Sequence, residues 1–379
     1  MTTTLQIPAE LLPADGRFGS GPSRVRRASL DALMASADGF LGTSHRQAPV
    51  RDQVARLRSG LVTLFDLPEG WEILLGNGGT TVFWDAATFG LVRERSQHIV
   101  CGEFSSKFAT ATATAPFLGA PDVIEVAPGA SGAPTARSGI DAYCLTHNET
   151  STGVMNPIVR PDGADADSLV LVDATSAAGA ASWDHDAVDV YYFAPQKVLA
   201  SDGGLWLAAC SPAAIDRIGE LAAGDRWIPA SIDLGTALDN SRKQQTYNTP
   251  ALVTIFLAAE QVDWLNAQGG LAFAEERCRQ TSGAIQAWAD KQAYVTPFVA
   301  DPADRSIVVT TIDFDGIDAA AVAATLRANG VVDVEPYRKL GRNQLRIATF
   351  PAVPLDDVEA LLACIEFVVE RLPEDGGAA

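Results

Sequence analysis

Two short apolar runs, LVLVD at 169–173 and VYYF at 190–193, decide the fold of this 379-residue chain. Apart from the terminal Asp173, both are continuously apolar rather than alternating, which is typical of strands buried on both faces of a sheet. Lys197 follows the second run after a short Ala-Pro-Gln segment, so an ionisable side chain lies close to the end of each strand. Strands of this kind, interleaved with helices, predict an α/β fold with a mostly parallel sheet.

Further segments extend this pattern on both sides. Helices are expected over ranges that include 51–65 and 81–93. Strands are expected at 71–75, 98–101, 142–146 and 205–208. The alternation predicts a large domain over residues 24–255 with a sheet of the seven-stranded type. An irregular N-terminal arm over residues 1–23 is expected to precede it.

Residues 256–379 follow a different pattern. We expect a long helical region at 254–291, a β-branched strand at 306–314, a helix at 319–329, strands at 331–335 and 345–348, and a final helix at 355–372. This order predicts a smaller C-terminal α+β domain. The tail at 374–379 is expected to be disordered.

Composition and charge narrow the function classes. Hydrophobic residues make up 47% and charged residues 20% of the chain, which is ordinary for a globular protein. The net charge of −19 argues against a nucleic-acid partner. No apolar run approaches the ~18 residues of a membrane span. The N-terminus has no basic residue before Arg17, which argues against a secretory or transit peptide.

The five cysteines are scattered and form no CxxC pair. This pattern favours neither a disulfide framework nor a metal site, and it fits a reducing, cytoplasmic environment.

Two segments at expected strand ends carry polar groups suited to a ligand. GNGGTT at 76–81 follows a strand and opens a helix, so its N–H groups and hydroxyls could cradle a phosphate. A plain glycine-rich turn is the simpler explanation. Asp173 could bind a metal, a ribose or a protonated ring nitrogen, while a helix cap is its ordinary alternative.

Lys197 is the third such group, in a chain with only five lysines against 23 arginines. A lysine can deprotonate and form a Schiff base, which an arginine cannot. A solvated surface lysine is the alternative, and it is the interpretation we give to Lys107, Lys243, Lys291 and Lys339. A phosphate loop, an aspartate and a lysine at successive strand ends are together the order expected for a pyridoxal-phosphate site.

The chain resembles the phosphoserine aminotransferases, a family of class V aminotransferases with the fold-type-I pyridoxal-phosphate architecture. The resemblance covers nearly the whole chain, in an actinobacterial-like form. It rests on Asp173, on an arginine pair near the C-terminus, and on the motifs FGSGP (18–22), SHR (44–46), NET (148–150), PQK (195–197) and YNTP (247–250).

The resemblance implies a role for each matched cofactor residue. Lys197 matches the lysine that binds pyridoxal phosphate as a Schiff base and moves the substrate proton, and Asp173 matches the partner of the pyridine nitrogen. The other matched cofactor contacts are Gly79, Thr80, Phe104, Thr150, Gln196, Asn248 and Thr249. Asn248 and Thr249 match a pair that reaches the neighbouring subunit's cofactor, which implies a homodimer with shared active sites.

The resemblance also implies cations for two anionic ends of the substrate. Arg346 matches the arginine that pairs with the α-carboxylate, where a bidentate fork suits the geometry. His45 and Arg46 match a pair donated across the dimer to the distal phosphate or carboxylate, with Arg338 as a helper. Ser20 in the arm matches a substrate or cofactor contact.

Three positions depart from the family pattern. Phe104 stands where the family usually stacks a tryptophan on the cofactor, Thr80 where many relatives have an arginine, and Tyr337 where a histidine is typical. A phenyl ring can still stack. Phosphate binding in the cradle is then expected to rely more on N–H groups and hydroxyls.

The implied function is a ping-pong transamination from L-glutamate to 3-phosphohydroxypyruvate, which gives O-phospho-L-serine and 2-oxoglutarate in serine biosynthesis. Some relatives also serve pyridoxine biosynthesis. The nearest alternative is a class V enzyme with an unphosphorylated substrate, such as a serine–glyoxylate aminotransferase. A cysteine desulfurase needs a mobile cysteine, whereas Cys364 lies in an expected helix, and a dinucleotide fold lacks its GxGxxG. A non-catalytic cofactor-binding protein is the alternative from another class.

Overall fold

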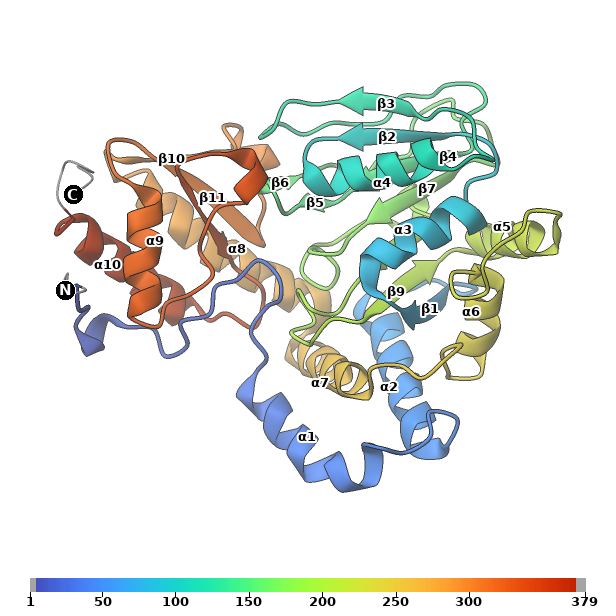
Figure 1. Cartoon of the computed structure of the whole chain (residues 1–379), viewed down its shortest axis with the longest axis horizontal. Coiled ribbons are helices and arrows are strands. Elements are labelled where there is room, and N and C mark those ends of the chain that lie inside the picture. The colour runs from blue at the N-terminus through green and yellow to red at the C-terminus, as the bar shows by residue number, and fades with distance from the viewer. Residues whose placement is uncertain (1–4, 373–379) are drawn as a thin grey trace.

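The apolar strands assemble into one seven-stranded sheet in the computed structural model of the chain, which describes residues 5–372 (Figure 1). In spatial order the strands are β1 (Glu72–Asn77), β9 (Leu205–Cys210), β8 (Val190–Phe193), β7 (Leu169–Asp173), β4 (Ala142–Thr146), β2 (Ser96–Val100) and β3 (Asp122–Glu125). All adjacent pairs are parallel except the two that include β9. The prediction of a mostly parallel sheet is confirmed.

Helices cover both faces of this sheet, which explains the continuous apolar runs. Val170 and Val172 of β7 pack on one face with α2 (Ala48–Leu64) and α7 (Leu252–Gln268). Leu169 and Leu171 pack on the other. There they meet α3 (Gly79–Gly90), α4 (Glu103–Thr114), α5 (Pro212–Ala223) and α6 (Leu234–Arg242). Burial on both faces is the arrangement expected of parallel strands.

A smaller α+β unit follows, as the sequence predicts (Figure 1). Its antiparallel sheet contains β10 (Val295–Pro297), β11 (Val309–Phe314) and β12 (Gln344–Ala348). Its helices are α8 (Gly270–Ala289), α9 (Ala319–Ala328) and α10 (Leu355–Val369). The N-terminal arm, which holds one 3-10 turn at Ala9–Leu11, inserts Ile7 and Phe18 into the core of this unit.

Several expected elements differ from the structure. The helical region expected at 254–291 is two helices, because Gly269 and Gly270 adopt φ values of 120° and 71° between α7 and α8. The strand expected at 331–335 is wrong: only Val332 forms a bridge, to Arg17, and the next residue, Asp333, has a φ of 67°. The sequence reading also missed β3, β10 and the short hairpin of β5 (Asn148–Glu149) and β6 (Val154–Met155).

Two predictions concern the limits of the domains. Helix α7 crosses the expected boundary at 255/256, and its Ile255, Ala258 and Val262 belong to the core of the large sheet. We therefore propose that the smaller domain begins after α7. The tail expected to be disordered, 374–379, lies outside the described residues.

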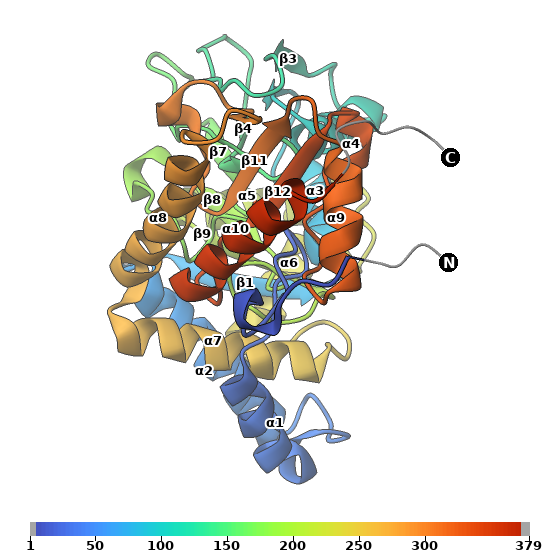
Figure 2. The same cartoon turned by 90° about the vertical axis from the view of Figure 1, so that its left-hand side faces the viewer.

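Helix α1 (Arg27–Phe40) projects from the rest of the molecule in both views (Figures 1 and 2). Leu33 and Phe40 anchor it against α7, while Met34 is 75% exposed. Within residues 5–372, no helix combines the length and the apolar character needed to cross a membrane.

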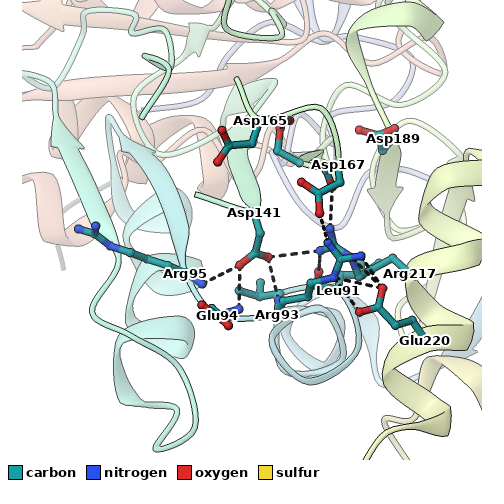
Figure 3. A network of polar contacts seen from close by, with 12 residues as sticks. Leu91, Arg93, Glu94, Arg95, Asp141, Asp165, Asp167, Asp189, Arg217 and Glu220 are labelled. Atoms are coloured by element: carbon teal, nitrogen blue, oxygen red, sulfur yellow. Dashed lines mark hydrogen bonds and ion pairs between the residues drawn. The ribbon is translucent and has the colours of Figure 1, made fainter. Parts of the chain in front are cut away.

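An ion-pair network holds the amino ends of the parallel strands (Figure 3). Asp141, just before β4, accepts the backbone N–H groups of Arg93, Glu94 and Arg95 at 2.7–2.8 Å and Nη1 of Arg217 at 3.3 Å. Arg217 is 2% exposed and also donates to the carbonyls of Leu91 and Asp167. The network connects the amino ends of neighbouring strands to helix α5.

Candidate active site

The carboxyl ends of the parallel strands surround a cavity of about 260 Å³. The lining includes seven of the residues expected from the sequence: Gly79, Thr80, Phe104, Thr150, Asp173, Gln196 and Lys197. Ligands of open α/β sheets bind at this edge. Five strands contribute, because the chain leaves β1, β2, β4, β7 and β8 on the same side of the sheet.

Lys197 presents a buried amine to this cavity. Its Nζ donates a hydrogen bond to the carbonyl of Ser20 in the N-terminal arm. Burial, with Arg346 adding to the effect, lowers the pKa of the Lys197 amine to about 8. Gly21 leaves room for it, since a Cβ there would lie 2.5 Å from Lys197 Cε. The amine is therefore poised to lose its proton close to neutral pH.

Asp173 faces the cavity with its carboxylate fixed by three donors. Thr175 donates its N–H at 3.0 Å and its hydroxyl at 2.5 Å to Oδ1, and Trp84 donates Nε1–H at 3.0 Å to Oδ2. Burial raises the pKa of Asp173, and the hydrogen bonds from Thr175 and Trp84 oppose that shift. The arrangement keeps a buried carboxylate available to a cationic ligand group.

The expected phosphate cradle opens α3. Gly78 caps the helix with a φ of 108°, and a Cβ there would collide with Val82 at 2.4 Å, so glycine is required. No side chain caps the helix, so the N–H groups of its first turn are free for a ligand, and the residues of that turn line the cavity. The Thr80 hydroxyl lies 2.9 Å from that of Thr175. Such a helix start binds anions through its N–H groups and dipole.

The NET motif forms one wall of the cavity. Thr150 donates to the Ser176 hydroxyl at 2.8 Å, and Asn148 reaches the same oxygen. Glu149 is fully buried and accepts the N–H groups of Phe104 and Ser105 at the start of α4. This cap fixes the backbone that carries the Phe104 ring at the cavity.

Arg346 comes from the smaller domain and reaches the same wall. Its Nη1 donates to the carbonyl of Thr150 at 3.2 Å, while its buried Nε has no partner among the described residues. Its guanidinium lies 5.5 Å from the centre of the Tyr337 ring. That ring in turn contacts Phe104, with centroids 5.9 Å apart. The guanidinium thus lies at the junction of the two domains with donors to spare.

None of the expected substrate residues, Arg346 included, belongs to the cavity lining. Arg338 is exposed and has no hydrogen bond or ion pair within residues 5–372. The next residue, Lys339, pairs with Glu103 at the start of α4. The hydroxyl of Ser20 is buried without a partner in the same described part of the chain, although its carbonyl meets Lys197.

His45, Arg46, Asn248 and Thr249 form a separate group beside the end of β1. His45 Nδ1 lies 3.2 Å from Thr249 Oγ1, and Arg46 Nη1 donates to Gln245 at 3.0 Å. Asn77, the last residue of β1, donates to Asn248 Oδ1 at 2.5 Å. The structure therefore brings the two motifs SHR and YNTP together, but it does not bring them into the cavity of the same chain.

Gly78 and Thr81 of the lining belong to the cradle predicted at 76–81, whereas six lining residues were not expected: Trp84, Thr146, Asn148, Thr175, Ser176 and Gly204. Thr175 and Ser176 follow Asp173 directly, which is a local signal. Trp84 lies one helical turn after Thr80, and that spacing could have indicated a shared face of α3. Thr146 and Asn148 lie within or close to the NET motif, and this position in the sequence is the only signal that could have indicated them.

The residues present fit pyridoxal phosphate, the cofactor that the resemblance implies. An open helix start suits its phosphate, Asp173 suits a protonated ring nitrogen and Lys197 suits its aldehyde. Two lining atoms, Oε1 of Gln196 and Oδ1 of Asn148, are buried without partners among the described residues. Unpaired polar atoms at a cavity indicate a site built for a polar ligand.

Comparison with known proteins gives consistent results. A model of the class V aminotransferase family matches residues 30–334. The chain is 62% identical over 374 residues to a phosphoserine aminotransferase of Nocardioides sp., covering 98% of this chain and 100% of that one. It is 55% identical to the Rhodococcus jostii phosphoserine aminotransferase, with 98% and 100% covered.

A solved structure of a phosphoserine aminotransferase from Cytophaga hutchinsonii superposes with a TM-score of 0.86 at 23% identity, covering 95% of this chain and 100% of that one. The enzyme of the same name from Bacillus circulans subsp. alkalophilus gives 0.80 at 20% identity, with 94% and 98% covered. These two likenesses bear on the fold.

Proposed function

The chain belongs to the class V aminotransferases and, within them, to the phosphoserine aminotransferase family, and from this premise we propose how its own residues carry out the reaction. It is a pyridoxal-phosphate-dependent aminotransferase. The proposed reaction transfers the amino group of L-glutamate to 3-phosphohydroxypyruvate, giving O-phospho-L-serine and 2-oxoglutarate. The observation that carries the proposal is the convergence of Lys197, Asp173 and the start of α3 on one cavity.

When bound, pyridoxal phosphate takes the amino group from one substrate, gives it to the next and withdraws electrons from the substrate α-carbon. Lys197 would hold the cofactor covalently, and its free amine, whose pKa burial lowers to about 8, would move the substrate α-proton. Asp173 holds the proton on the ring nitrogen. The N–H groups of Gly79 and Thr80 would bind the phosphate, and the Phe104 ring is available to stack on the cofactor ring.

Thr150 and Gln196 are proposed to complete the cofactor contacts from the NET and PQK motifs. The Thr150 hydroxyl lies in a buried hydrogen-bonded pair with Ser176. Oε1 of Gln196 is buried and unpaired among the described residues, so it can accept a bond from the ligand. Neither side chain needs to move a proton.

Arg346 is proposed to bind the substrate α-carboxylate. Its Nη1 already donates to Thr150, but its Nε is unpaired among the described residues, so the planar guanidinium can still form a bidentate pair with a carboxylate. Arg338, exposed and free of partners among the described residues, is available to the distal phosphate. Ser20 contributes a hydroxyl next to Lys197. These positive and polar groups favour a doubly anionic substrate over a neutral one such as serine.

We propose a homodimer in which His45 and Arg46 reach the partner's substrate, and Asn248 and Thr249 reach the partner's cofactor. The grouping of these four residues outside their own cavity supports this division. Two copies related by two-fold symmetry would then share both sites. A cytoplasmic location is proposed as well, supported by five buried cysteines that form no disulfide.

The first test is the visible absorption spectrum of the purified protein, supplied with pyridoxal phosphate, before and after addition of O-phospho-L-serine. Loss of the yellow band with O-phosphoserine, and its persistence with serine at the same concentration, is the expected result. An equal response to serine would point to the unphosphorylated-substrate alternative. Absence of any bound cofactor band would contradict the assignment of Lys197.

Complementation in mixed dimers tests the shared site. Lys197→Met and Arg46→Ala are each expected to inactivate both sites of their own homodimer. Co-expression of the two should restore about a quarter of wild-type activity, because half of the dimers then contain one intact site. Arg51→Ala on neighbouring helix α2 is the matched control for Arg46→Ala and should leave activity unchanged. No recovery on co-expression would contradict the division between subunits.

A further inference from the structure

Trp84 takes no part in the proposed cofactor or substrate contacts, yet it touches the carboxylate at the centre of the site. It lies on α3, is 5% exposed and lines the cavity. Its indole Nε1–H donates to Oδ2 of Asp173 at 3.0 Å. The residue is one helical turn from Thr80, so the helix that binds the anion also carries a donor to Asp173.

The donors on Asp173 leave one acceptor position open. A carboxylate offers about four acceptor positions, two on each oxygen. Thr175 occupies both positions of Oδ1 with its N–H and its hydroxyl. Trp84 occupies one position of Oδ2. The remaining position therefore belongs to Oδ2, on a residue that lines the cavity.

The Thr175 hydroxyl also connects Asp173 to the cradle. Since its single proton goes to Asp173, the Thr80 hydroxyl is the donor in the 2.9 Å contact between the two threonines. Hydrogen bonds in such a buried chain strengthen one another and fix the rotamers of their members. Thr80, Thr175 and Asp173 therefore form one hydrogen-bonded chain that ends at Oδ1 of Asp173, while Trp84 donates to Oδ2 of the same carboxylate.

We propose that Trp84 and Thr175 are positioning residues that keep Asp173 ionised and aim its one free acceptor position at the ring nitrogen of the cofactor. The inference rests on the proposed function, in which Asp173 holds the proton on that nitrogen. Hydrogen bonds to a carboxylate favour its charged form, whereas burial favours the neutral acid. Without either donor, the pKa of Asp173 rises, the carboxylate takes up a proton itself, and the ring nitrogen loses its proton more readily.

A purely structural role for Trp84 is the competing explanation, because its ring also packs in the core formed by α3 and the sheet. Trp84→Phe separates the two, since it removes the N–H donor and keeps an aromatic ring. Trp206→Phe is the matched control. Trp206 is 2% exposed and lies in the same core, where its ring centroid is 5.0 Å from that of Phe83. It does not line the cavity.

The test uses holoenzyme loaded with pyridoxal phosphate labelled with ¹⁵N in the ring, whose chemical shift reports protonation of the nitrogen directly. Wild type and Trp206→Phe should both show a protonated nitrogen at neutral pH. Trp84→Phe should move the shift toward the unprotonated form and lower kcat about tenfold or more, with KM changed less. Thr175→Val should move the shift in the same direction, and Thr175→Ser should restore it.

The outcomes separate this inference from the proposed function. Wild-type protein that binds no cofactor, or holds an unprotonated ring nitrogen, would overturn the proposed role of Asp173 itself. A protonated wild-type nitrogen whose shift is unchanged in Trp84→Phe and Thr175→Val would overturn only the positioning role. If Trp84→Phe does not fold, the Thr175→Val and Thr175→Ser pair decides the question by the same measurement.

Discussion

The two ends of the seven-stranded sheet carry similar side chains and use them in opposite ways. At the amino ends, Asp141 accepts four hydrogen bonds and Arg217 donates to two carbonyls as well as to Asp141 (Figure 3). At the carboxyl ends, the Lys197 amine has one carbonyl acceptor, and Gln196 Oε1 is buried without a partner among the described residues. Buried polar groups that are paired within the protein stabilise the fold. Buried polar groups without a protein partner lower its stability but remain able to bind a ligand.

The largest expected effect comes from breaking the carboxyl end at Lys197. Lys197→Met is expected to lower kcat by more than about 10³-fold, because it removes both the covalent link and the proton-moving amine. At neutral pH the cofactor-free variant should be at least as stable as wild type, since a desolvated amine is replaced by an apolar chain of similar length. Steady-state assays and urea unfolding measure the two effects.

The second prediction breaks the amino end instead. Arg217→Leu is expected to lower the free energy of unfolding by about 3 kcal/mol, because it removes a buried charge from its partners, while the folded protein keeps its kcat. Arg95→Leu, in the same network but bound through its side chain only to the Ala120 carbonyl, should cost less than about 1 kcal/mol. A large loss of kcat in folded Arg217→Leu would contradict the separation of the two ends.

The sequence predicted the carboxyl end better than the contacts that organise it. Lys197 and Asp173 could be identified because strand ends are local features of the chain. The bond from Trp84 to Asp173 spans 89 positions, and that between Thr175 and Thr80 spans 95. Such contacts depend on the rotation of α3 against the sheet, which the sequence pattern does not specify.

The same limit explains the elements that were wrong or incomplete. A β-branched pattern at 331–335 predicted a strand, but the left-handed backbone at Asp333 prevents it. Conversely, the family motifs SHR and YNTP pointed to residues that meet across 204 positions, His45 and Thr249. The resemblance implied related roles for the two motifs, and the structure shows that they lie in contact.

The third prediction follows from the pKa of the buried amine, which is lowered from 10.5 to about 8 in the cofactor-free protein. Below pH 8 the amine is protonated in both folded and unfolded chains, so the burial penalty is constant. Between pH 8 and 10.5 only the unfolded chain holds the proton, and stability therefore rises with pH. The total gain is about 3 kcal/mol, and it is complete above pH 10.5.

Lys197→Met provides the reference for this measurement, because other groups that titrate in the same range cancel in the difference. Urea unfolding of both cofactor-free proteins from pH 7 to 11 gives the two curves. The stability of wild type relative to the variant should rise across the window. A flat difference would show that the amine keeps its ordinary pKa in the folded chain.

The smallest expected effect compares one residue type at the two ends of the sheet. Both Nη groups of Arg217 donate to protein acceptors, whereas Arg346 has an acceptor among the described residues only for Nη1. Arg346→Lys retains the charge and loses the fork, so KM for the anionic substrates should rise about tenfold with kcat changed less. Arg342→Lys is the control, because Arg342 is already paired with Asp313 on the surface of the smaller domain and should leave KM unchanged. Equal KM values for both variants would mean that Arg346 serves the domain junction, through Thr150 and Tyr337, rather than the substrate.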